Sequence, residues 1–322
     1  MKRHVELPPD AREAIDRAVG YVDRRLSSDE ETAAVVRDLL VDLFGDRPAY
    51  ERYRATTNGR GTTTGRFGDR PAYERYRAGG SISPLARVRL RSYDPRNVLV
   101  ETEHWAEQDL ADLREAKCLQ FLWRGFDCSP LAHNVAFALP FRRVLATHLF
   151  DDVGEGVKLF GGIKIQCGHN IEIGDHTVVH NDVLLDDRGR LTIGDRVSIA
   201  DRSHLHTHHH DLADQADVTH YRTVVADDAR LGYDAMVGAG SRVGENAMVG
   251  ASAMVRGDVP DHHVAVGAPA KTVKVKPGWE SVADAPGPLP DNREDRRLER
   301  DIPDDLDPID EFGRDLSPPG DA

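Results

Sequence analysis

The feature that most constrains the fold is a six-residue repeat in the second half of the sequence. Aliphatic residues recur at every sixth position, and each of the first four is followed by glycine: Leu231, Val237, Val243, Val249 and Val255. This period matches neither an α-helix nor a flat strand. It matches a solenoid in which each hexad forms a short strand and a corner, the aliphatic side chain fills the axis, and glycine permits corner backbone angles that a Cβ would hinder.

The first part of the chain lacks the six-residue repeat and has a different hydrophobic pattern. Residues 1–150 are predicted to be α-rich, with two amphipathic helices over residues 9–43. The segment 44–55 recurs unchanged at 67–78. Identity over the whole repeated segment indicates a recent tandem duplication or an assembly error, and we assign it no function.

Repeat-like sequence extends over residues 155–275 and then stops. Residues 276–322 are acidic and rich in proline. This composition predicts a largely disordered tail, with one helix near Asn292–Asp301.

The charge of the chain narrows the class of function. With 55 acidic and 42 basic residues, the net charge of −13 argues against a nucleic-acid-binding surface over the whole molecule. The chain is rich in aspartate and contains few lysines, which is typical of extremely halophilic archaea, whereas a GC-rich genome is the alternative explanation. Three cysteines do not indicate a disulfide framework, and no apolar run suggests a membrane span or signal peptide. We expect a cytoplasmic protein.

Motifs within the repeat resemble a known family. They are Gly168–Asp175 (GHNIEIGD), Asn181–Asp186 (NDVLLD), Leu191–Asp195 (LTIGD) and Val266–Lys271 (VGAPAK). Residues 155–275 resemble the hexapeptide-repeat acyltransferases, in particular the maltose and galactoside O-acetyltransferase branch. The resemblance implies a mainly β fold, a left-handed parallel β-helix preceded here by the α-rich region. It also implies a homotrimer with active sites between subunits, and acetyl-CoA or another acyl-CoA as co-substrate.

A histidine-rich segment interrupts the hexads and is the candidate catalytic loop. The phasing lapses between Leu205 and Val225, where the sequence is HTHHHDLADQADVTHYRTVV. In the family that the chain resembles, such a loop carries a catalytic histidine, which an ungapped alignment places at His210, with His208 as the alternative. A neutral imidazole is suited to accept the proton of a hydroxyl that attacks a thioester carbonyl. Because no nucleophilic side chain is needed, we expect direct transfer without an acyl-enzyme.

The resemblance also assigns residues to the acceptor, a hydroxyl of a sugar or related small molecule. The acceptor-side asparagine of the family corresponds to Asn181, and Asp186 is a second candidate contact. For both, the alternative is a hydrogen-bonding role in a turn.

On the CoA side, the contacts carried over from the family are Ala251, Arg256 and Gly257. Lys271 joins them because three of the seven lysines of the chain fall within Lys271–Lys276. Such clustering suits the phosphates of CoA, although an ordinary charged surface remains the alternative.

Two other functions fit the same repeat. The γ-class carbonic anhydrases share the β-helix and hold zinc between subunits with histidines from neighbouring coils, and His204 and His209 have a compatible spacing. Those enzymes, however, continue in regular hexads where this chain has a loop. Alternating His206, His208 and His210 offer another arrangement for a metal. A non-catalytic scaffold is the third function, and for the transferase we expect no metal.

Overall fold

The computed structural model describes residues 9–45, 92–105, 110–212 and 217–300, together with Leu85 and Val88. The chain divides into two compact units, residues 1–100 with 117–132, and residues 101–116 with 133–322. Apart from Phe44 and Gly45, both copies of the duplicated segment lie outside the described residues.

The first unit is helical, as the sequence predicts. Its helices α1 (Pro9–Leu26) and α2 (Thr32–Leu43) coincide with the two amphipathic segments. Close to α2 lies α6 (Leu110–Asp127), where a Cβ on Gly125 would be 2.4 Å from Cδ2 of Leu40. Among the described residues before the solenoid, the short 3-10 helices are η1 (Pro95–Asn97), η2 (Glu101–His104) and η3 (Pro130–His133). No described helix is both long and apolar enough to cross a bilayer.

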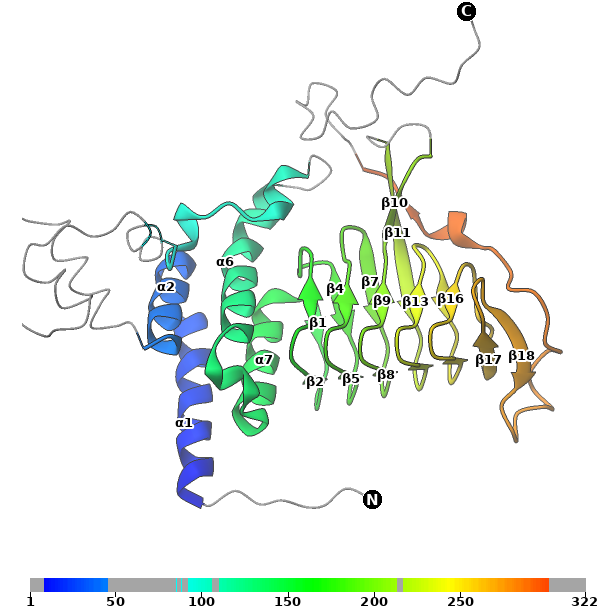
Figure 1. Ribbon diagram of the computed structural model, residues 1–322, viewed down its shortest axis with the longest axis horizontal. Helices are drawn as coiled ribbons and strands as arrows, with labels where there is room; N and C mark the ends of the chain where they lie inside the picture. The colour runs from blue at the N-terminus through cyan, green and yellow to red at the C-terminus, as the bar shows by residue number, and fades with distance from the viewer. Residues whose placement is uncertain are drawn as a thin grey trace, which may run out of the picture. The chain divides into compact units, whose positions relative to one another are not determined.

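The second unit is a parallel β-solenoid with three faces (Figure 1). Sheet A contains β1 (Asp152–Val153), β4 (Ile171–Ile173), β7 (Arg190–Ile193), β11 (Val218–Val225) and β14 (Arg242–Val243). Sheet B contains β2 (Lys158–Leu159), β5 (Val178–Val179), β8 (Ser198–Ile199), β12 (Arg230–Leu231), β15 (Met248–Val249), β17 (His263–Val266) and β18 (Lys271–Val275). Sheet C contains β3 (Lys164–Ile165), β6 (Leu184–Leu185), β9 (His204–Leu205), β13 (Met236–Val237) and β16 (Met254–Val255). The predicted class, a β-solenoid after an α-rich region, is confirmed.

The aliphatic residues of the hexads fill the interior as predicted. In β12 to β16 the second residue of each strand is the hexad residue, and each is at most 2% exposed. At the first turn, α7 (Val135–Leu149) packs against β1 and β2 and buries Phe141 and Leu145. The hexad positions of these strands therefore form an apolar axis, which α7 covers at the first turn.

Three edges join the sheets: edge 1 leads from sheet A to B, edge 2 from B to C, and edge 3 from C to A. Glycine at edge 1 has a different role from the one predicted. Gly244 has no positive φ, but a Cβ there would lie 2.6 Å from the amide nitrogen of Asp261. The positive φ belongs to residues such as Asp228 (59°) and Asn246 (52°). For the hexad glycines of this edge, such as Gly244, the predicted reason is therefore wrong: glycine is needed there because successive corners approach closely. Gly156, on the first corner of the same edge, does have a positive φ of 66°.

Aspartates link the corners of successive turns. On edge 1, Oδ1 of Asp195 accepts the N–H of Asp175 at 2.8 Å, and Oδ1 of Asp227 accepts the N–H of Asp195 at 3.0 Å. On edge 2, Oδ1 of Asp201 accepts the N–H of Asn181 at 2.9 Å. The Gly-Asp pair that recurs in the sequence thus combines close approach with satisfaction of a corner amide.

The beginning of the tail packs on the solenoid, which corrects the prediction of a largely disordered tail over residues 276–322. After β18 the chain runs back along edge 3 through η4 (Arg293–Arg296), and β19 (Arg297–Leu298) pairs antiparallel with β11 (Figure 1). The contacts are mostly hydrogen bonds to backbone groups, which an acidic, proline-rich composition does not prevent. Residues 301–322 lie outside the described part.

Candidate functional site

Edge 3 brings several predicted residues into one column. Asp186, His206, Gly238 and Arg256 occupy the same position on successive turns, directly after the strands of sheet C. The amide of each of the first three donates to a strand carbonyl of the next turn, at 2.9–3.0 Å. Since paired strands are about 4.8 Å apart, Asp186 and Arg256 are separated by about 14 Å.

The loss of hexad phasing corresponds to a β-hairpin that leaves edge 3. In it, β10 (His208–His210) pairs antiparallel with β11, and His208 lies opposite His220. The second half of β11 then joins sheet A beside β7 and β14. The predicted histidine loop is thus an ordered hairpin, apart from residues 213–216, which lie outside the described residues.

Thr207 fixes the base of this hairpin. Its hydroxyl donates to the carbonyl of Asp186 at 2.8 Å and accepts the N–H of Gly189 at 2.8 Å. Its carbonyl accepts the N–H of Tyr221 at 2.7 Å. The histidine strand therefore starts from a rigid corner.

Asp186 and His208 form the central pair of the site. Nδ1 of His208 lies 2.7 Å from Oδ2 of Asp186, and Nδ1 of His206 lies 3.4 Å from the same oxygen. The side chains of Asp186 and His208 are 2% and 14% exposed. The contact is close but lacks the angles of a well-formed hydrogen bond, and Nδ1 of His208 has no hydrogen-bond partner among the described residues. Burial opposes ionisation of Asp186, but His206 and His208 outweigh it and hold its pKa well below the usual range.

Two further histidines flank this pair. His220 is 1% exposed, and burial, together with the charge of Arg300, lowers its pKa to about 3, so its imidazole is neutral at pH 7. The ring of His210 stands edge-on to that of His208, with the centroids 5.4 Å apart, and His210 is exposed. The site thus combines one paired, one buried and one exposed histidine.

Asp187 has a structural role that differs from that of its neighbour. It is fully buried and accepts the amides of Cys167 at 2.7 Å and Gly168 at 2.6 Å, on the preceding turn. Burial raises its pKa to about 6, although these amides act in the opposite sense. Asp187 therefore closes a corner, and Asp186 faces the histidines.

Asn181 and Ala251, two of the predicted binding residues, lie on edge 2 and not on edge 3. The side-chain amide of Asn181 donates to Oδ1 of Asp201 at 3.3 Å, in addition to its backbone contact with the same oxygen. A single chain therefore does not bring Asn181 to His208.

The predicted CoA contacts fall into two groups. Arg256 and Lys271 are exposed cations without an ion pair among the described residues. Gly257 is buried: its N–H donates to the hydroxyl of Ser241 at 3.1 Å, and a Cβ on it would lie 2.6 Å from the carbonyl oxygen of Pro290. Cationic groups thus suit the phosphates of CoA at two positions, whereas the tail covers Gly257.

Sequence reasoning missed some residues near this site. Arg188, directly after the two aspartates, has its guanidinium 3.4 Å from the ring centroid of Trp105. No motif connects these residues, which are far apart in the sequence. Asp186 was expected to contact the acceptor, and its pairing with His208 was not foreseen. The available signal was the alternation of histidines after Leu205, which places His206, His208 and His210 on one side of an extended chain.

The two histidines considered for zinc lie on different strands of the chain. His204 belongs to β9, whereas His209 belongs to β10 and stacks on Tyr221, with the ring centroids 5.2 Å apart. Over the described ranges, no group of three or more His, Cys, Asp or Glu side chains is placed to hold a metal ion.

Known proteins similar to this chain were found among solved structures. No family model matches the sequence, and no curated protein matches it. A maltose O-acetyltransferase from Clostridium difficile 630 is 22% identical, covering 55% of this chain and 98% of its own, with a TM-score of 0.47. A galactoside acetyltransferase in complex with coenzyme A is 19% identical over 68% of this chain and 99% of its own (TM-score 0.47). A hexapeptide-repeat acetyltransferase from Vibrio cholerae complexed with acetyl coenzyme A is 25% identical over 51% of this chain and 87% of its own (TM-score 0.45). The likeness is one of fold.

Proposed function

We propose that this protein is an acyl-CoA-dependent O-acyltransferase that transfers an acetyl group from acetyl-CoA to a hydroxyl of a sugar or related small molecule. The observation that carries the proposal is the pairing of His208 with the buried Asp186 on edge 3 of a hexapeptide solenoid. A carboxylate at Nδ1 orients the imidazole, leaves Nε2 for the substrate and stabilises the imidazolium that forms when a proton is accepted. The sequence motifs point to the same class.

Within this proposal His208 is the general base, and His210, the first candidate from the sequence, is secondary. His208 has the buried carboxylate at Nδ1, whereas His210 is exposed beside it. Nε2 of His208 accepts the proton of the acceptor hydroxyl while the hydroxyl oxygen attacks the thioester carbonyl carbon. The carbon–sulfur bond then breaks, and the proton passes to the departing thiolate. Such base catalysis contributes about 10²–10⁴-fold to the rate.

The proposed donor site lies on the same edge, toward the C-terminal end of the solenoid. Arg256 follows His206 by two turns on edge 3, a separation of about 10 Å. Lys271 starts β18, next to Ala270, whose N–H donates to the carbonyl of Met254 at 2.8 Å. The two cations therefore flank the end of β16, where they are available to the phosphates of CoA. Gly257 is removed from the donor site because the tail covers it.

We propose a homotrimer in which sheet C faces a neighbouring subunit. The outward residues of sheet C align in register: after the exposed Lys164 of β3 come Leu184, His204, Met236 and Met254, which are half-buried and, apart from His204, apolar. Sheet A carries charged outward residues instead, such as Glu172 and Arg242. Sheet C lies between edges 2 and 3, so packing on it brings Asn181 of one subunit toward His208 of another, where it orients the acceptor.

Calorimetric titration of CoA tests the proposal without knowledge of the acceptor. The purified protein is held in molar salt, because we further propose a cytoplasmic protein of a halophilic archaeon. We expect saturable binding near one CoA per subunit, weakened in an Arg256→Gln variant. A folded protein that binds no CoA contradicts the transferase, and its zinc content is then the next measurement. With CoA bound, release of free thiol from acetyl-CoA in the presence of candidate sugars identifies the acceptor.

A further inference from the structure

The segment Asp284–Leu298, here called the C-terminal strap, follows edge 3 back toward the histidine hairpin. At its start, Nε2 of His263 lies 2.9 Å from the carbonyl oxygen of Asp284. Thr272 and Gly287 exchange two hydrogen bonds, with the Thr272 hydroxyl donating to the Gly287 carbonyl at 2.6 Å and accepting the Gly287 N–H at 2.7 Å. Figure 1 shows the strap in orange, running from β18 toward β10 and β11.

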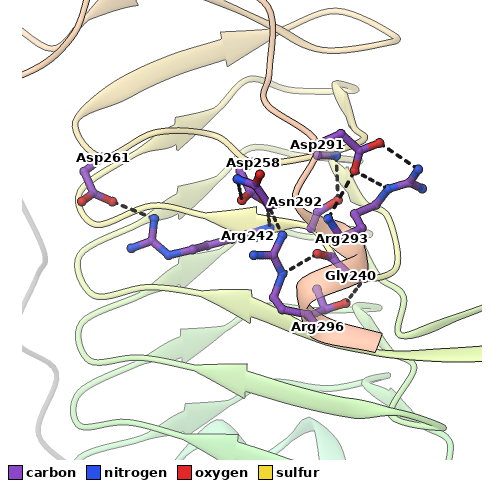
Figure 2. Close-up of polar contacts among 11 residues, drawn as sticks. Gly240, Arg242, Asp258, Asp261, Asp291, Asn292, Arg293 and Arg296 are labelled. Carbon is purple, nitrogen blue, oxygen red and sulfur yellow. Dashed lines mark hydrogen bonds and ion pairs between the residues drawn. The ribbon is translucent and has the colours of Figure 1, made fainter. Parts of the chain in front are cut away.

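Arg296 is the central anchor of the strap (Figure 2). Its Nε donates to the carbonyl of Gly240 at 2.6 Å, and its terminal nitrogen pairs with Oδ1 of Asp258. Asn292 donates to Oδ2 of Asp258 at 3.1 Å, and the N–H of Arg242 donates to Oδ1 at 3.0 Å. The side chains of Arg296 and Asp258 are 17% and 11% exposed. This buried, fully bonded carboxylate ties the strap to two turns of edge 3.

The strap ends on the strand that supports His208. In β19, Arg297 and Leu298 pair with Tyr221 and His220 of β11. The hydroxyl of Tyr221 also donates to Glu294 at 3.2 Å. Since β10 pairs with β11 through the same residue, His220, β11 has β10 on one side and β19 on the other. A hairpin of two strands is marginally stable in water, and a third strand stabilises it.

We propose that the C-terminal strap is a positioning element of the candidate site, and that Arg296 holds β11, and through it His208, in the geometry that meets Asp186. Anchoring of the hairpin follows from the contacts of the strap alone. The statement that the positioned histidine is catalytic rests on the proposed function. Arg296 touches neither His208 nor a substrate in this arrangement, so it acts through β11.

Two matched variants test the proposal in the full-length protein. Arg296→Gln removes the anchor, whereas Arg297→Gln makes the same change one residue further, where the ion pair of the side chain, at 4.0 Å, is with Glu294 within the strap. Hydrogen exchange followed by mass spectrometry measures the opening of residues 218–222. We expect about tenfold faster exchange there in Arg296→Gln, wild-type exchange in Arg297→Gln, and partial recovery in Arg296→Lys. Exchange over residues 178–199 reports whether the solenoid remains folded.

Kinetics provide the second measurement. We expect kcat of Arg296→Gln to fall about tenfold, with KM for acetyl-CoA within about twofold of wild type, because the base is displaced and the donor site is not. Equal exchange in the two variants overturns the proposal, and so does an unchanged kcat with faster exchange. If exchange responds as expected but the wild-type protein binds no CoA and transfers no acyl group, the strap does anchor the hairpin and the proposed function fails.

Discussion

Edges 1 and 2 of the solenoid repeat one short corner on successive turns, whereas edge 3 carries the histidine hairpin and the C-terminal strap. At the repeated corners, close packing and aspartate side chains satisfy the backbone, as in the contact of Asp195 with the amide of Asp175. At edge 3 the corners differ in length from turn to turn. The difference teaches that the repeat specifies the scaffold, and that the departure from it brings together the side chains of the candidate site.

Asp186 and Asp187 show this difference within one corner. Asp187 accepts backbone amides of the preceding turn, like the aspartates of edge 1. Asp186 is equally buried but faces His206 and His208. A buried carboxylate directed at imidazoles rather than at backbone amides is the feature that makes this corner of edge 3 a candidate site.

The largest expected effect comes from His208→Gln. This change removes the proposed base, so kcat should fall by about 10²–10⁴-fold. Because His208 is also a partner of the buried Asp186, we expect a modest fall in the unfolding midpoint as well, and the rate is compared at a temperature where both proteins are folded. His209→Gln is the matched control, since its ring lies on the other side of β10, stacked on Tyr221, and there we expect less than about threefold loss. Thiol release from acetyl-CoA measures both. An inactive His210→Gln beside an active His208→Gln would assign the base to His210.

The next largest effect is expected at edge 1, in Gly244→Ala. The added Cβ would lie 2.4 Å from Oδ1 and 2.6 Å from the nitrogen of Asp261, so the corners of two turns must separate. We expect the free energy of unfolding to fall by about 2–4 kcal/mol, as measured by urea titration. Gly287→Ala is the control, because nothing lies within 4 Å of a Cβ at that position. Equal stability of the two variants would show that the corners are looser than the structure indicates.

A smaller effect is expected in the pH dependence of the free energy of unfolding, to which Asp186 and Asp187 contribute with opposite sign. The folded-state pKa of Asp186 is lowered, so its contribution is present above about pH 4 and is lost as pH falls below that value. The folded-state pKa of Asp187 is raised to about 6, so stability is lost as pH rises from about 4 through 6. Urea titrations between pH 3 and 7 should show opposite changes of slope in Asp186→Asn and Asp187→Asn, of about 1 kcal/mol for Asp186 and about 3 kcal/mol for Asp187 over this range. Slopes of the same sign would contradict the assignment of different roles.

The solenoid was predictable because its physics is local and repeated. One aliphatic residue in six, as in β12 to β16, is sufficient to specify a buried axis. Because the same pattern recurs in every turn, it can be recognised several times in one sequence. The role of glycine was assigned wrongly, because the approach of Gly244 to Asp261 depends on the stacking of two turns and cannot be seen within one corner.

The sequence predicted where the chain leaves the solenoid at edge 3, but it did not predict which side chains meet there. The lapse of hexads after Leu205 marked where the chain leaves the solenoid. The pairing of His208 with Asp186 depends on which turn stacks on which, and alignment favoured His210 because it carries no information on burial. The strap was missed for a different reason: its anchors, such as the carbonyls of Gly240 and Pro290, are backbone groups that composition does not reveal.

The smallest expected effect is at edge 2, in Arg202→Gln. Arg202 forms two hydrogen bonds with Asp234 of the next turn, at 2.7 and 2.9 Å, but both side chains are about half exposed. Exposed ion pairs are weak, and molar salt screens them further. Thermal unfolding in molar salt should therefore give the wild-type midpoint for this variant, with a small decrease only at low salt. A loss as large as that of Gly244→Ala would mean that surface ion pairs, rather than close packing and aspartate contacts, hold the repeated edges together.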